Sequence, residues 1–242
     1  MIAALRLLLL AAYLPLAHFA GARHSPLLAA LALGDLVLLL LVDGLLRRRA
    51  TAWLALALAV AVLVPLARSA YALLPLLLVP PLFTAIVALW FARSLRPGRV
   101  PLITRVVAAL YRQTLDELSP RHHRYARNLT LAWSLLLAAM TLLNLALALI
   151  AVPDGVLARL GIAAPMTVTG EQWSLIANLA NYGVLGGFAL IEYQVRKFVF
   201  PVRPYRNVVD FARQMAALGP AFWMEAHNSP GTTTTGQTWA LG

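Results

Sequence analysis

The stretch 118–133, LSPRHHRYARNLTLAW, concentrates the side chains of this sequence that are best suited to chemistry. It combines arginines at every third position with two consecutive histidines and the start of a long apolar run. A guanidinium binds phosphate or carboxylate through paired hydrogen bonds, and residues three apart share one face of a helix. We therefore predict a binding face for an anionic group, formed by Arg121, Arg124, Arg127, His122 and His123.

The alternative is that these residues only form a ring of positive charge that holds the end of a membrane helix at the membrane surface, here called a membrane collar. Eight arginines lie between Arg93 and Arg127, which is far more than orientation in a membrane requires. This excess favours a binding role for the segment in addition to a collar.

Metal and cofactor chemistry find little support in the sequence. His122 and His123 are adjacent, so on a helix they point about 100° apart and cannot ligate one metal as an i,i+4 pair does. The motifs HExxH, HxxxxD, GxSxG and the P-loop are absent. The chain has no cysteine, which excludes disulfides, thiolate nucleophiles and iron–sulfur clusters. We expect no metal and no other cofactor, and whether the chain is an enzyme stays open.

Several polar residues lie within apolar stretches. Asp35 stands in LALGDLVLLLLVDG, where a charge is expensive and usually functional, although it could also be a neutral or paired packing group. Glu192 either forms an i,i+4 ion pair with Arg196 or joins the arginines at 124–127 in a polar site. The other polar residues expected in the membrane or at its interface are Asn144, Asn178 and Tyr182.

Composition places these residues in a membrane protein. Of 242 residues, 61% are hydrophobic and only 12% are charged, and the mean hydropathy is +0.78. These values lie outside the usual range of a soluble domain. We predict an all-α fold, a polytopic transmembrane helix bundle, in which lipid and helix packing satisfy the apolar surface.

Six windows between the charges are long enough to span a membrane. A helix needs about 20 apolar residues to cross the hydrocarbon. From Thr51 to Trp90 the only charge is Arg68, and this length suffices for two crossings with a turn near 68–71. The predicted transmembrane domain covers residues 1–200, with spans at about 2–20, 26–46, 51–67, 70–91, 129–151 and 173–195.

The basic residues alternate between the predicted loops. Loops on one side hold Arg23, Arg68 and Arg159 alone, whereas those on the other hold the arginines at 47–49, the eight between 93 and 127, and five basic residues after the last span. Positive residues are retained in the cytoplasm. With Arg6 included, seventeen of the twenty basic residues are cytoplasmic if both termini are cytoplasmic. The alternation therefore predicts an even number of spans.

The N-terminal segment has a second interpretation. Residues 1–22 have a charged start, an apolar centre and small residues at Ala20 and Ala22, as in a cleaved signal peptide. Cleavage would leave five spans, and every remaining loop would stay on the same side of the membrane.

Two segments outside the spans have the pattern of amphipathic helices. In 101–118 the apolar residues fall on one half of a helical wheel and Arg105, Arg112 and Asp116 on the other. The segment 201–219 repeats the pattern. Each is expected either to lie in the cytoplasmic membrane interface or to pack against the bundle. The tail, 220–242, has no periodicity and is expected to be disordered.

Parts of the chain resemble a known protein family. RYARNLTLAW at 124–133, NYGVLGGFALIEYQVRK at 181–197 and RSLRPGRVPLITRV at 93–106 are similar to segments of the uncharacterised small membrane proteins that accompany aryl polyene and xanthomonadin pigment biosynthesis in Gram-negative bacteria. The likeness covers about residues 84–200. The resemblance implies a multi-pass inner-membrane accessory of a polyketide-like pathway whose intermediates ride on an acyl carrier protein, and it implies no known reaction.

Two classes of function follow. In the first, the chain is an accessory or scaffold protein of a lipid pigment pathway, and its Arg-rich cytoplasmic face binds an acidic carrier protein or anionic lipid. In the second, it is a membrane enzyme or transporter, for acyl transfer or export of a lipid-like product, that uses Asp35 and Glu192. The expected partners are membrane lipids, an acyl carrier protein and other pathway enzymes, and no nucleic acid.

Overall fold

The structure, a computed structural model, describes residues 2–69, 71–153, 155–169, 172, 175–176, 179–200, 204–219 and 222–223, without the side chains at 3 and 180–182. The chain divides into two compact units. The first comprises Met1–Pro81 and Leu143–Asn178, and the second comprises Leu82–Leu142 and Leu179–Gly242.

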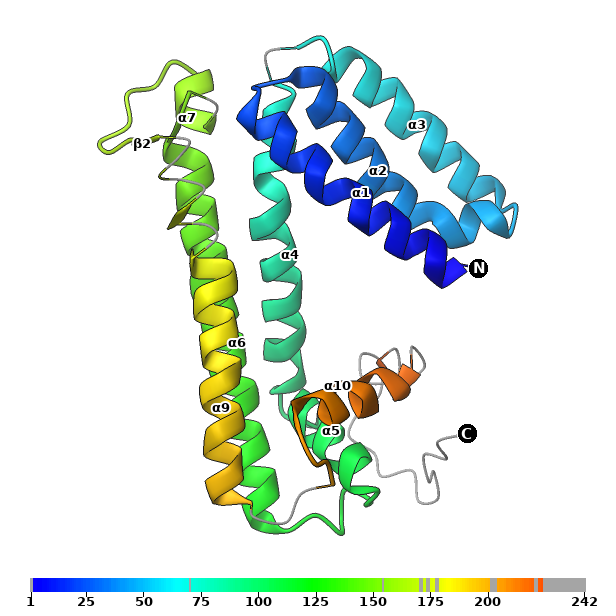
Figure 1. Ribbon diagram of the computed structural model, residues 1–242, viewed down its shortest axis with the longest axis vertical. Helices are drawn as coiled ribbons and strands as arrows, with labels where there is room; N and C mark the ends of the chain where they lie inside the picture. Colours follow the sequence, from blue (N-terminus) through cyan, green and yellow to red (C-terminus); the bar gives the residue numbers. More distant parts are fainter. Residues whose placement is uncertain are drawn as a thin grey trace. The chain divides into compact units, whose positions relative to one another are not determined.

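Three consecutive helices form a layer in the first unit. They are α1 (Ile2–Ala22), α2 (Pro26–Leu46) and α3 (Ala50–Leu66), and α2 packs against both of its neighbours (Figure 1). Their sequences are rich in leucine and alanine, which favour helix. Ser25 caps α2, since its hydroxyl accepts a hydrogen bond from the N–H of Leu28 at 3.4 Å.

Small residues allow these helices to approach closely. Ala20, Ala29 and Ala32 are fully buried. A Cβ added at Gly44 would lie 2.7 Å from the Cβ of Ala52, so glycine is required where α2 meets α3. Interfaces made of small residues are typical of transmembrane helices.

Large apolar residues of the same helices face outward. Leu7, Leu40 and Leu54 are 67%, 74% and 71% exposed, and only 6% of the most apolar 18-residue stretch of α1 is buried. Apolar area on this scale is unfavourable in water, whereas lipid satisfies it.

Among the described residues, four helices are long and apolar enough to cross a membrane, by length and composition: Ala4–Ala22, Pro26–Leu46, Leu73–Ser94 and Pro120–Ile150. The last two are α4 (Leu73–Ser94) and α6 (Pro120–Ile150). The chain is therefore helical, as predicted, and has helices suited to a membrane protein. The third predicted span is α3, which has 17 residues.

The predicted sixth span is only partly within the described residues. Its later part is the π-helix η1 (Leu179–Val184) followed by α9 (Leu185–Val199). The fifth span also differs, because α6 begins nine residues before the predicted start at 129. The arginines that precede the apolar run are therefore part of the same helix.

A short β-ladder interrupts the helical pattern of the first unit. Strand β1 (Ala151–Val152) pairs in parallel with β2 (Val168–Thr169), and the short helix α7 (Val156–Arg159) lies between them in sequence. The apolar side chains of Leu147 and Val168 are buried together beside this pairing. Two-residue strands carry no periodic signal, so the all-α prediction did not include them.

In the second unit, α5 (Leu102–Tyr111) is shorter than the predicted helix at 101–118. It ends because Arg112 adopts a left-handed conformation, with φ 54°, and the N–H of Gln113 donates to the carbonyl of Ala108 at 3.0 Å. Glycine usually occupies this position of a helix stop. An arginine stands at this position instead, so no helix stop was expected there and the length was overestimated.

Two buried hydroxyls fix the start of α5. Ser94, at the end of α4, accepts a hydrogen bond from the N–H of Leu102 at 3.0 Å, and Thr130 of α6 accepts one from the N–H of Ile103 at 3.3 Å. These bonds satisfy N–H groups that have no partner within the helix. They attach α5 to the part of α6 that carries the Arg-rich stretch.

The last helix of the second unit, α10 (Val208–Ala217), is also shorter than the predicted 201–219. It begins after Asn207, whose side chain accepts a hydrogen bond from the N–H of Asp210 at 2.8 Å. The N–H of Arg206 donates in turn to the Asp210 carboxylate at 2.9 Å and holds the pKa of Asp210 below its usual range. Of the predicted disordered tail, nearly all lies outside the described residues.

The apolar faces of α5 and α10 pack against each other (Figure 1). The centre of this cluster is formed by residue 222 together with Val106, Ala109 and Leu110 of α5, which are buried. Phe211 and Met215 of α10, and Leu218 directly after it, pack against this centre. The apolar face of α5 is therefore buried within the second unit, whereas α10 covers it with half-buried side chains.

Candidate functional site

Three exposed arginines lie on the first turns of α6. Arg121, Arg124 and Arg127, here called the Arg stripe, follow each other at three-residue spacing on one continuous helix. They therefore share one face, as predicted. Ser119 caps this helix, because its hydroxyl accepts a hydrogen bond from the N–H of His122 at 3.3 Å. No acidic side chain pairs with the Arg stripe among the described residues.

A shallow hollow of about 330 Å³ opens beside the Arg stripe. We call it the basic hollow, and its lining residues are Arg121, Arg124, Tyr125, Asn128 and Val199. Two of the three arginines thus line it, whereas Arg127 does not. Within the described part of the chain, its lining has no carboxylate.

Both predicted histidines are engaged in packing contacts. The His122 ring stacks on Phe200, with centroids 4.2 Å apart and 14° between the planes, and its Nδ1 lies 2.8 Å from the Ser119 hydroxyl. His123 Nε2 donates to the carbonyl of Leu115 at 2.8 Å. Neither imidazole lines the basic hollow, so its charge comes from the arginines.

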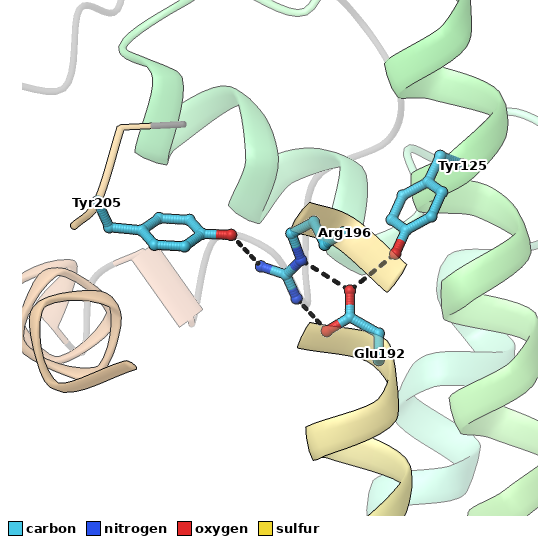
Figure 2. Close-up of polar contacts among 4 residues, drawn as sticks. All are labelled: Tyr125, Glu192, Arg196 and Tyr205. Atoms are coloured by element: carbon cyan, nitrogen blue, oxygen red, sulfur yellow. Dashed lines mark hydrogen bonds and ion pairs between the residues drawn. The ribbon is translucent and has the colours of Figure 1, made fainter. Parts of the chain in front are cut away.

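Glu192 of α9 is the centre of a buried polar network (Figure 2). Its carboxylate forms an ion pair with Arg196, whose Nε donates at 2.7 Å and whose other contact is through a terminal nitrogen. The Tyr125 hydroxyl donates to the same carboxylate at 3.0 Å. Arg196 also donates to the Tyr205 hydroxyl at 3.2 Å. The sequence left two roles open for Glu192, and the i,i+4 ion pair with Arg196 is the one observed.

The candidates expected within the membrane lie in a different compact unit from Glu192 or outside the described side chains. Asp35 belongs to the first unit, and its Oδ2 is buried without a hydrogen-bond partner within the described part of the chain. Asn144 is also in the first unit and is 5% exposed. Asn178 lies outside the described residues, and for Tyr182 only the backbone, in η1, is described.

No arrangement of metal ligands occurs in the described ranges, where groups of three or more histidine, aspartate or glutamate side chains do not converge. The lining of the basic hollow consists of two guanidinium groups, one amide, one phenol and one aliphatic side chain. Its guanidinium and amide groups are suited to bind an anion.

Four residues of the site were not predicted. Tyr125 and Asn128 follow Arg121 and Arg124 by four residues each, so helical spacing could have identified them. Val199 and Tyr205 come from another part of the chain, and only the packing of the second unit brings them to the site.

Comparisons with protein-family models, with curated proteins and with solved structures find no match to this chain.

Proposed function

We propose that the protein is a membrane scaffold or accessory protein whose Arg stripe binds an acidic carrier protein or anionic lipid. The observation that carries this proposal is the Arg stripe itself, which is exposed, continuous with a helix suited to cross a membrane, and without an acidic partner in the described ranges. The resemblance of residues 84–200 adds the context, a polyketide-like pathway for an aryl polyene or xanthomonadin-type lipid pigment.

The proposed architecture has six spans in a bacterial inner membrane, with both termini in the cytoplasm. The alternating basic loops support it. The ion pair between Arg6 and Asp43 supports it too, because it joins the start of α1 to the end of α2, next to the arginines at 47–49. In this architecture α5 and α10 lie at the cytoplasmic surface, where Val208 and Val209 of α10 remain 47% and 68% exposed and face the membrane interface.

The test replaces Arg124 and Arg127 by glutamine, which keeps polarity and removes charge. Binding of the cognate acyl carrier protein to the full chain in nanodiscs is measured at low and at high salt. We expect wild-type binding to weaken with salt and the double variant to lose it, because exposed charges are screened. Equal binding of the carrier protein by wild type and double variant, or no binding at either salt concentration, would show that the Arg stripe serves only as a membrane collar.

One observation favours the transporter alternative. The Asp35 carboxylate has a buried, unpaired oxygen in a helix suited to cross a membrane, and such groups often serve proton or ion transfer. Glu192, the second residue of this alternative, is already held by Arg196 and Tyr125. In a pigment export assay, Asp35→Asn abolishes export if the carboxyl is used and leaves it unchanged if Asp35 only packs.

A further inference from the structure

The basic hollow has the chemistry of a site for a single phosphate group. Two guanidinium groups and the Asn128 amide line it, and paired hydrogen bonds from arginine suit phosphate oxygens. Its volume of about 330 Å³ suits a small headgroup. A protein partner would instead need an interface of about 800 Å² on each side.

Contacts around the basic hollow preserve its positive charge. The guanidinium carbon of Arg121 lies 5.7 Å from the centroid of the Phe200 ring, a cation–π contact that restricts this long side chain. Tyr125 is fixed by its hydrogen bond to Glu192, and Arg196 compensates the charge of that carboxylate. The two arginines of the hollow are therefore not neutralised by the neighbouring network.

The helix that supplies Val199 to the basic hollow also carries exposed apolar side chains. Val199 lines the hollow, and the preceding residue of α9, Phe198, is 85% exposed. Two turns earlier, Leu190 and Ile191 are 63% and 65% exposed. These exposed apolar side chains on the helix of Val199 favour a ligand that carries apolar chains beside its phosphate over a soluble phosphate compound.

We infer that the basic hollow binds the phosphodiester headgroup of an anionic phospholipid such as phosphatidylglycerol. Arg121 and Arg124 hold the phosphate, Asn128 donates to the headgroup, and the acyl chains lie against α9. The inference deepens the proposed function and rests on it in one respect, the position of the Arg stripe at the membrane surface.

The experiment uses the full chain in phosphatidylcholine nanodiscs that contain a small fraction of phosphatidylglycerol. After release into mild detergent, native mass spectrometry counts the retained phosphatidylglycerol molecules. We expect wild-type protein to retain phosphatidylglycerol in preference to phosphatidylcholine. Arg121→Gln or Arg124→Gln should lower this preference on the order of tenfold, because each removes a charged hydrogen bond.

Two further variants separate the hollow from general electrostatics. Arg99→Gln removes the same charge from an exposed position of the second unit that lies outside both the hollow and the Arg stripe, so it should leave retention unchanged. Val199→Trp fills the hollow without altering charge, so it should reduce retention. Equal losses in Arg124→Gln and Arg99→Gln would overturn the inference, as would full retention by Val199→Trp. Wild-type protein that shows no preference would overturn it without any variant.

A soluble arm tests the source of the phosphate. Glycerol phosphate added to protein in pure phosphatidylcholine nanodiscs should not bind, and binding as tight as that of phosphatidylglycerol would contradict a lipid site. The outcome of the carrier-protein binding assay does not depend on the outcome of the lipid retention assay. The carrier-protein assay uses soluble carrier protein and pure phosphatidylcholine nanodiscs, which contain no anionic lipid, so a failure of lipid retention and a failure of carrier-protein docking are distinguishable.

Discussion

Two ion pairs of this protein differ in what surrounds them. The side chains of Glu192 and Arg196 are 8% and 17% exposed, whereas those of Asp43 and Arg6 are 41% and 49% exposed. An exposed ion pair contributes about 0–1 kcal/mol to stability. In a buried pair, removal of one partner leaves the other charge without compensation, and this costs about 3–5 kcal/mol.

Glu192→Leu should therefore lower the free energy of unfolding by about 3 kcal/mol, since Arg196 loses its counter-charge and Tyr125 its acceptor. Denaturant unfolding in detergent micelles, followed by tryptophan fluorescence, measures this loss. The matched control is Asp43→Leu, which should change stability by less than about 1 kcal/mol. Similar losses in both variants would show that the Glu192 network is not buried as described.

Only part of this network could be read from the sequence. The spacing of Glu192 and Arg196 is an i,i+4 pattern on a helix, and it correctly indicated their pairing. Tyr125 lies 67 residues away from Glu192, and no local pattern connects the two. The same holds for Val199 beside Arg124, so the hollow itself was not predictable, although its arginines were.

Three helix ends share an unusual feature. His24, Arg48 and Arg112 occupy left-handed positions with φ of 47°, 52° and 54°, where glycine is preferred. Two of the three are arginines in the basic loops. The two arginines keep a positive charge at a conformational cost of about 1 kcal/mol each.

Arg112→Gly should consequently raise the free energy of unfolding by about 1 kcal/mol, because glycine adopts the left-handed conformation without steric strain. Arg112→Ala serves as the control for the lost side chain and should give no gain, since alanine keeps the strain. Thermal unfolding of the purified variants measures both. A gain with alanine equal to that with glycine would attribute the effect to the removed charge instead.

Helices were easier to predict than their ends. α2 begins and ends as predicted, at Pro26 and Leu46, because a serine cap and a run of arginines flank a uniform apolar stretch. The start of α6 was misplaced because the predicted span was bounded by its apolar residues. The helix itself continues through the preceding arginine, histidine and tyrosine residues. The end of α5 was misplaced because an arginine holds the left-handed position.

For the whole molecule, the distribution of charge is the main argument for the proposed orientation. In the proposed six-span arrangement, seventeen basic residues fall on one side. The Arg6–Asp43 pair agrees with this count, as it holds the N-terminal arginine near the basic turn after α2.

A reporter that is active only in the periplasm should remain silent when fused after Arg213 and should be active when fused after Leu160. The reciprocal cytoplasmic reporter should give the opposite pattern and controls for expression. Periplasmic activity after Arg213 would contradict an even number of spans with cytoplasmic termini.

The Arg6–Asp43 pair also has a consequence for biogenesis. The two residues are 37 positions apart, so Arg6 is synthesised well before its partner. Until then α1 carries an uncompensated charge, which its side chain must direct toward the aqueous phase. The pair can form only after nearly all of α2 has been translated. The first two helices thus reach their final state together, as a helical hairpin, and the order of translation imposes a delay on the first of them.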